Sequence, residues 1–383
     1  MKNLLNSFSK LETPFYYYDL ELLRETLKTV QKANAEGYHI HYALKANVNP
    51  RILDTIREFG LGIDCVSGGE IQIALDNGFT PNQIVLAGVG KTDKEIAFAL
   101  EKDIFSFNVE SIAELEVINE IAGKLDKVAR ISMRINPEIE AGTHKYITTG
   151  TKENKFGVSR SELFDSLEFI RSCSNVEFIG LHYHIGSQIT DLTKFKALAN
   201  RVNDIQSMLV EKGFELPVLN LGGGLGIDYE NPDTNAIPDF ERYFKIFNEQ
   251  LEVLPGQEVH FELGRSIVGQ CGTLMSRVLY MKEGGHTKFA ILDAGMTELM
   301  RPALYQAVHK LQNISSDQPE EEYDVVGPIC ESSDFFGKKT KLPRTKRGDM
   351  IAIRSAGAYG ETMRSNYNGR EFAESYYSDD LGQ

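Results

Sequence analysis

The feature that most constrains this chain is a repeat of short apolar runs alternating with helical stretches. Through the first two thirds of the sequence, each apolar or β-branched run is followed by a loop and then by apolar residues spaced three and four apart. The runs are IHYAL from Ile40, GIDCV from Gly62, QIVLAG from Gln83, IFSFNV from Ile104, ARISMRI from Ala129, EFIGLHYHI from Glu177, VLNLG from Val218 and EVHFEL from Glu258. Eight βα units predict an α/β fold, a (β/α)8 TIM barrel rather than an open sheet.

Three stretches between these runs have a clear helical pattern. They are residues 49–60, 91–102 and 192–213, and the last ends in a glycine suited to a helix C-cap. After about Ser266 the pattern changes to strand-like runs with few helices: TLMSRVLYM, KFAILDAG, EYDVVG and DMIAIRSAG. A second, C-terminal β-rich domain is therefore expected.

The predicted domain boundaries follow from this change of pattern. Residues 31–267 are expected to form the barrel, and residues 1–30 and 268–383 the β-rich domain. The aromatic segment FYYYDL, residues 15–20, is predicted to pair as a strand into the β-rich domain. The acidic stretch at residues 315–322 is predicted to be a solvated loop.

Composition excludes several classes of function. The 383 residues carry a net charge of −14, which repels phosphate backbones and argues against a nucleic-acid partner. No run of eighteen apolar residues and no secretory leader is evident, so a soluble, cytoplasmic protein without a membrane partner is expected. The four cysteines have neither metal-ligand spacing nor disulfide density; they are expected to be mostly reduced core thiols, and no metal is expected.

Polar and glycine residues gather where the predicted strands end, which is where barrel enzymes carry their chemistry. They are Lys45; Ser67 and Glu70; Asn108 and Glu110; Arg134 and Asn136; His184 and Ser187; Gly222, Gly223 and Gly224; and Glu262 and Arg265. This convergence is stronger evidence for an active site than any single motif.

Lys45 directly follows the first strand. A partly desolvated amine on a rigid element is suited to attack an aldehyde and form a Schiff base. Taken alone, the residue is more simply explained as a lysine at the barrel rim with its stem along apolar surface, and the neighbouring motifs must overturn that explanation.

The other strand-end residues have similar alternatives. The backbone N–H groups of Gly222, Gly223 and Gly224 can cradle a phosphate, which Arg265 can complete as a permanent cation, although glycines also serve tight turns. Glu262 can keep a pyridine nitrogen protonated, or it can pair with a buried arginine. His184 can stack on a ring or belong to the core.

Five motifs in order resemble one known family. They are YALKAN at Lys45, HYHIGS at His184, NLGGGLG at Gly223, ELGR at Arg265 and GPICES at Cys330. Along its whole length the chain resembles the alanine-racemase-fold, or fold-type III, pyridoxal-phosphate decarboxylases, and within them the branch that acts on diaminopimelate. The resemblance implies pyridoxal 5′-phosphate as cofactor and a head-to-tail homodimer whose active sites are completed by the neighbouring subunit.

The same resemblance implies the site residues. Lys45 carries the cofactor as an aldimine, His184 stacks on the ring and Glu262 holds its nitrogen. The remaining cofactor contacts fall on Ser187, Gly222, Gly223, Gly224, Gly264, Arg265 and Tyr359. Where the family usually has proline this chain has Leu263, and only a small loss of loop rigidity is expected because Gly264 can still make the bend.

The expected reaction is decarboxylation of meso-2,6-diaminopimelate to L-lysine and carbon dioxide. Cys330, a thiol with a suitable reference pKa, is expected to return the proton at Cα, although a structural cysteine is the simpler reading of that residue alone. Arg301 and Tyr305 are expected to bind the distal carboxylate and Glu331 the distal amine, with Arg265 and Tyr359 also near the substrate. The alternatives are an ornithine or arginine decarboxylase and a non-catalytic pyridoxal-phosphate carrier.

Overall fold

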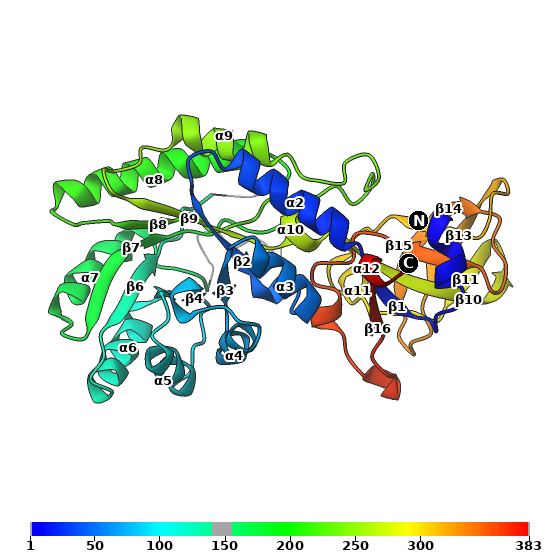
Figure 1. The fold of residues 1–383 in the computed structure, drawn as a ribbon, viewed down its shortest axis with the longest axis horizontal. Helices are drawn as coiled ribbons and strands as arrows, with labels where there is room; N and C mark the ends of the chain where they lie inside the picture. The colour runs from blue at the N-terminus through cyan, green and yellow to red at the C-terminus, as the bar shows by residue number, and fades with distance from the viewer. Residues whose placement is uncertain (1, 140–154, 382–383) are drawn as a thin grey trace. The chain divides into compact units, whose positions relative to one another are not determined.

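The computed structural model describes residues 2–139 and 155–381 (Figure 1). The chain divides into two compact units. The barrel unit comprises 27–226 and 239–264, and the β unit comprises 1–26, 227–238 and 265–383. The short segment 227–238, which the sequence pattern left inside the barrel, is thus part of the β unit.

The barrel unit contains a closed barrel of eight parallel strands in chain order. The strands are β2 (His39–Ala43), β3 (Gly62–Cys65), β4 (Ile84–Leu86), β5 (Ser106–Val109), β6 (Ala129–Arg134), β7 (Val176–His182), β8 (Val218–Asn220) and β9 (Glu258–Leu263). Each of the eight predicted runs contains or overlaps one of them, so the predicted TIM barrel is confirmed.

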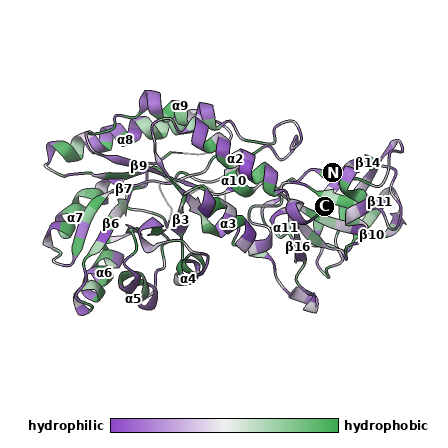
Figure 2. Cartoon of the chain, viewed as in Figure 1, coloured by the Kyte–Doolittle hydropathy of each residue, from purple (hydrophilic) through white to green (hydrophobic). Residues whose placement is uncertain are grey.

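Helices follow the barrel strands and lie outside them in Figure 1. They are α3 (Pro50–Glu58), α4 (Gly68–Asp76), α5 (Asp93–Lys102), α6 (Ile112–Lys124), α7 (Arg160–Ser172), α8 (Thr193–Glu211) and α9 (Phe240–Gln250), while α2 (Leu20–Ala33) crosses the division between the units. Figure 2 shows green hydrophobic and purple hydrophilic residues alternating along α7 and α8. In α8 the buried residues include Phe195, Leu198 and Val202, so an apolar stripe faces the barrel.

The first turns of these helices are fixed by side-chain caps. Ser67, Thr92, Ser111 and Ser159 each accept a hydrogen bond from a backbone N–H three residues further on. Such caps end the preceding loop at a defined residue, and the loops after β3, β4 and β5 are short.

The β unit is built on one sheet in the order β12-β15-β10-β11-β13-β14, with β1 pairing to both β10 and β16. The strands are β1 (Phe15–Tyr18), β10 (Gly272–Gly284), β11 (Thr287–Leu292), β12 (Leu311–Asn313), β13 (Glu320–Val326), β14 (Phe335–Pro343), β15 (Met350–Ile353) and β16 (Glu374–Tyr377). The short helices are α1 (Leu5–Phe8), α10 (Arg265–Val268), α11 (Arg301–Tyr305) and α12 (Ser378–Leu381). The opening aromatic segment pairs into this sheet, as predicted.

One prediction for the β unit is wrong. Residues 320–322 of the acidic stretch are not loop, because they begin β13 and pair with β14. Lys288 on β11 forms an ion pair with Glu321 there, so local charge compensation lets acidic residues occupy a strand.

Two further features concern the described residues. None of their helices is long and apolar enough to cross a membrane. All four cysteines are free, as expected, but only Cys65 and Cys271 are buried in the core.

Candidate functional site

Lys45 and Asp64 face each other at the carboxyl ends of β2 and β3. Lys45 lies in the 3-10 turn at Leu44–Ala46, and its Nζ is 2.8 Å from Oδ2 of Asp64. Asp64 is fully buried, and burial together with the negative charge of Glu262 raises its pKa to about 6, against the opposing charge of Lys45. The amine is therefore held at a defined place by a buried carboxyl.

Glu262, on β9, is fixed by three hydrogen-bond donors. Its Oε1 accepts from the amides of Asn108 at 3.0 Å and Asn220 at 2.8 Å, and its Oε2 accepts from Nε2 of His182 at 3.1 Å. Burial works to raise the pKa of Glu262, but the hydrogen-bonded His182 and the charge of Lys45 outweigh it and lower the pKa. A carboxylate has about four acceptor positions, so one remains for a further donor.

The glycine loop after β8 is in close contact with its neighbours. An added Cβ would lie 2.2 Å from the Tyr183 carbonyl oxygen at Gly222, 1.8 Å from that of Glu262 at Gly223 and 2.5 Å from that of Gly186 at Gly224. No side chain fits at any of the three positions, which leaves backbone alone on this surface. The loop is suited to an anion that needs close approach of N–H groups.

The loop after β7 is tied to this glycine loop. The N–H of Gly223 donates to Nδ1 of His184 at 3.2 Å, and the N–H of Ile189 donates to the carbonyl of Gly224 at 2.9 Å. Ser187, half-buried, lies between these two attachments in the chain. Burial, with the charges of Arg134 and Lys45, lowers the pKa of His184 to about 3, so its ring is neutral near pH 7.

The structure gives Gly264 a different role from the expected one of making a bend after Leu263. Leu263 is buried in β9 opposite Tyr42, and Gly264 has no left-handed φ. A Cβ on Gly264 would instead lie 3.0 Å from Cβ of Ala43 and 3.2 Å from Cβ of Ala46. Glycine is required there by close packing against the segment that carries Lys45, rather than by a bend.

In the β unit, two buried arginines are arranged around Tyr229. Nη1 of Arg265 donates to the hydroxyl of Tyr229 at 2.5 Å, and its guanidinium lies 4.8 Å from the Tyr359 ring. The guanidinium of Arg301, the first residue of α11, lies 4.9 Å from the Tyr229 ring. Cationic groups packed on aromatic faces stay oriented while remaining charged.

His309 orients Arg301. Its Nδ1–H donates to the carbonyl of Arg354 at 2.8 Å, which leaves Nε2 to accept from Nη1 of Arg301 at 2.8 Å. Burial, followed by the charge of Arg301, lowers the pKa of His309 to about 3. Among the described residues no carboxylate forms an ion pair with Arg301.

Cys330 and Glu331 are exposed on a loop of the β unit. Asp334 shapes that loop, because its two oxygens accept from the N–H groups of Met296 at 2.7 Å and Ile329 at 2.8 Å. The N–H of Cys330 donates to the Asn368 side chain at 3.1 Å.

Comparison with known protein families identifies the part of the chain that includes the barrel. Residues 20–269 match the family model described as the pyridoxal-binding domain of pyridoxal-dependent decarboxylases. The chain belongs to this family. The cofactor is pyridoxal phosphate, and the protein is a pyridoxal-dependent decarboxylase.

Individual relatives narrow the branch. The chain is 56% identical to a diaminopimelate decarboxylase of Bacteroides thetaiotaomicron over 98% of each protein, and 41% identical to one of Aquifex aeolicus over 97% of this chain and 87% of that protein. It also matches the crystal structure of the Helicobacter pylori diaminopimelate decarboxylase complexed with L-lysine, at 41% identity and a TM-score of 0.92, over 98% of this chain and 94% of that one. Within the family, the chain belongs with the diaminopimelate decarboxylases.

The predicted residues divide between the units. Lys45, His184, Ser187, Gly222, Gly223, Gly224, Glu262 and Gly264 lie in the barrel unit, and Arg265, Arg301, Tyr305, Cys330, Glu331 and Tyr359 in the β unit. Sequence reasoning missed Asp64, His182 and His309 as positioning residues. A charged residue inside the apolar run GIDCV was the available signal for Asp64; His182 and His309 had none, because their partners lie far away in the sequence.

Proposed function

We propose that this protein converts meso-2,6-diaminopimelate to L-lysine and carbon dioxide. The proposal is supported by membership of the decarboxylase family and by close likeness to diaminopimelate decarboxylases along nearly the whole chain. The observation that carries the choice of substrate is Arg301, a buried guanidinium without a carboxylate partner among the described residues, because the second carboxylate of diaminopimelate supplies that partner.

The barrel-end residues fit the cofactor. Lys45 would hold the cofactor through its amine, His184 would lie against the ring, and the glycine loop with Ser187 and Arg265 would hold the phosphate. Gly264 and Tyr359 complete the contacts. The vacant acceptor position of Glu262 suits a protonated pyridine nitrogen, and the glycine cradle excludes side chains where the phosphate is expected.

Bound pyridoxal phosphate supplies an electron sink for the bonding pair left behind when the Cα–carboxylate bond breaks. The charge and hydrogen bond of His182, with the charge of Lys45, keep the Glu262 carboxylate ionised against its burial, so it would favour a proton on the ring nitrogen. His184, neutral near pH 7, would present an uncharged face to the ring. Asp64 binds the ammonium of Lys45 and so keeps the released side chain beside the site.

The proton returned to Cα is assigned to Cys330, supplied with Glu331 by the neighbouring subunit of a homodimer. The loop that carries both residues is held in shape by hydrogen bonds to Asp334. Cys330 and Glu331 are exposed, which is required if they act in the active site of the neighbouring chain. The distal carboxylate of the substrate is assigned to Arg301 and Tyr305 and the distal amine to Glu331, with Arg265 and Tyr359 also near the substrate.

Two organisational proposals accompany this function. The expected cofactor-binding domain, residues 31–267, corresponds to the barrel unit except for residues 227–238 and 265–267, which belong to the β unit; the expected β-rich domain, residues 1–30 and 268–383, contributes to the dimer and its active sites. The family match covers residues 20–269 and so supports a cofactor-binding domain in this part of the chain. A biosynthetic role of this kind suits a cytoplasmic protein.

The test measures carbon dioxide release by the purified holoenzyme from meso-diaminopimelate, ornithine and arginine. We expect turnover of diaminopimelate alone, and a loss of at least ~100-fold in kcat/KM for Arg301→Met because a desolvated, charge-assisted contact is removed. Arg347→Met is the matched control, since Arg347 also lies over a tyrosine ring, 5.2 Å from that of Tyr280, but is exposed. Release from ornithine and not from diaminopimelate would contradict the proposal, and cofactor binding without turnover would favour a carrier.

A further inference from the structure

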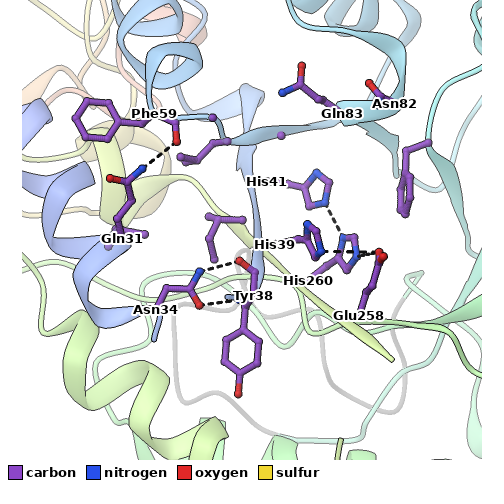
Figure 3. Close-up of a pocket in the computed structure, with 16 residues that line it drawn as sticks. Gln31, Asn34, Tyr38, His39, His41, Phe59, Asn82, Gln83, Glu258 and His260 are labelled. Carbon is purple, nitrogen blue, oxygen red and sulfur yellow. Dashed lines mark hydrogen bonds and ion pairs between the residues drawn. The ribbon is translucent and has the colours of Figure 1, made fainter. Parts of the chain in front are cut away.

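A group of imidazoles and one carboxylate lies at the amino-terminal end of the barrel strands, the end away from Lys45. Glu258 and His39 begin β9 and β2, and His39 is the register partner of His260 across that strand pair. Figure 3 shows the three side chains directed toward one another. Oε2 of Glu258 is 3.3 Å from Nε2 of His260 and 3.9 Å from Nε2 of His39, and one ligand atom from each residue lies within 4.8 Å of the others.

His41 holds His260 in one orientation. Nε2 of His41 is 2.8 Å from Nδ1 of His260, and both rings are buried. When Nδ1 of His260 donates to His41, the lone pair of its Nε2 is directed toward Glu258. Gly62 makes room for this arrangement, because a Cβ there would lie 2.5 Å from Nδ1 of His41.

The cluster is open to solvent on one side. It lines a cavity of ≈420 Å³, and the side chains of His39 and Glu258 are 54% and 52% exposed. A solute can therefore reach His39 and Glu258 without any rearrangement of the barrel strands, whereas His260 is buried directly behind Glu258.

We propose that His39, Glu258 and His260 bind a divalent transition metal ion, with zinc as the best match. Two imidazole nitrogens and a carboxylate oxygen are the donors that zinc takes, with water in the fourth position. Bonds of about 2.0 Å in a tetrahedron place donor atoms roughly 3.3 Å apart. The pair formed by Glu258 and His260 already has this spacing, and the exposed ring of His39 moves inward to complete it.

Other features required of a metal site are present. The residue that orients a ligating imidazole through its second nitrogen is His41, and the exposed side supplies an entry path. The competing explanation is that the rings only pack, since those of His39 and His260 stack at 4.6 Å. Packing alone does not require the carboxylate of Glu258 beside both nitrogens.

The ion would join the first and last strands of the barrel. β2 and β9 close the cylinder, and their ligands are far apart in the unfolded chain, so metal binding favours the folded state. The site lies at the opposite end of the strands from Lys45, and the decarboxylation rate is expected to be independent of the ion.

The experiment titrates Zn²⁺ by calorimetry into untagged holoenzyme that has been treated with a chelator and desalted. We expect one zinc per chain with a Kd at or below the micromolar range, and a rise in the unfolding temperature at saturating zinc. His39→Ala and Glu258→Gln, both changes at exposed side chains, should each weaken binding at least ~10-fold, and His41→Gln should weaken it by about 10-fold to 100-fold.

His286→Ala is the matched control, since His286 is exposed in the turn between β10 and β11. This variant should bind zinc as the wild type does, and cobalt in the same site should show the visible absorption of a four-coordinate ion. Zinc binding that is equal in the wild type and in His39→Ala, or weaker than about 1 mM in the wild type, overturns the proposal. Because zinc binding is measured directly, a failure of the proposed decarboxylase activity would not affect this test.

Discussion

Two buried carboxyls beside Lys45 differ in their hydrogen bonding. Glu262 receives three donors and its pKa is lowered, whereas Oδ1 of Asp64 has no hydrogen-bond partner among the described residues and the pKa of Asp64 is raised to about 6. The charge and hydrogen bond of His182 lower the pKa of Glu262 against its burial, whereas burial and the negative charge of Glu262 raise the pKa of Asp64. Sequence position alone could not have separated these two roles, since both residues lie near the ends of barrel strands.

The neutral state of His309 predicts a pH-dependent stability. Its pKa is lowered from 6.5 to about 3, so its contribution is present above pH 6.5 and is lost as the pH falls toward 3. Between pH 8 and pH 5 this one residue should lower the free energy of unfolding by about 2 kcal/mol. Urea denaturation of the wild type and of His309→Gln at both pH values measures the difference.

Glutamine can keep both hydrogen bonds of His309, to Arg301 and to the carbonyl of Arg354, but it does not titrate. The variant should therefore lose about 2 kcal/mol less than the wild type over that range. His286→Gln, at an exposed histidine, should retain the wild-type slope. An identical slope in His309→Gln would mean that this imidazole is not held neutral by burial.

At the scale of elements, strand ends and loops carry the site. The glycine loop after β8 could be predicted from its sequence, but the reason that it tolerates no side chain could not. Each glycine lies against a carbonyl oxygen of another segment, after β7 or in β9. That contact depends on how three strands lie side by side in the barrel.

Gly223→Ala should disrupt this loop. Its Cβ would lie 1.8 Å from the carbonyl oxygen of Glu262, so either the loop or β9 must move. We expect the affinity for pyridoxal phosphate to fall at least ~10-fold and stability to fall by 1–3 kcal/mol, roughly, as for other overpacked sites. Gly90→Ala is the control, since no atom lies within 4 Å of its added Cβ and its φ is not positive; wild-type affinity in Gly223→Ala would refute the cradle.

Strands of the two units differed in how readily the sequence revealed them. The barrel strands are buried and read as apolar runs, and all eight were predicted. The missed strands β12, β14 and β16 are short or carry polar residues, such as the KKTK of β14, whose lysines are exposed. Such strands form because they pair with a neighbouring strand, and without burial on both faces their sequence does not show a continuous apolar run.

For the whole molecule, the central prediction is an active site shared by two chains. Lys45→Ala should abolish the absorbance of the bound cofactor, while Cys330→Ala should retain cofactor and lose turnover. When the two inactive variants are mixed and allowed to exchange subunits, half of the dimers contain one intact site. Activity should recover to about a quarter of the wild-type value.

Each variant alone is the control for that mixture. No recovery, in a sample whose subunit exchange is verified by mass-tagged chains, would place Lys45 and Cys330 in the same chain's site. An active monomer in sedimentation would contradict the shared site directly.

The sequence by itself determined the barrel, the β-rich appendage, the family and most of the residues assigned to the cofactor. It could do so because alternating strands and helices, glycine loops and strand-end side chains are local patterns. Tertiary structure decided which groups meet. In the folded chain Asp64 forms an ion pair with Lys45, and Glu262 accepts three hydrogen bonds. His309 accepts a hydrogen bond from Arg301, and His39 lies beside His260. Each of these contacts joins segments that only the folded chain places together.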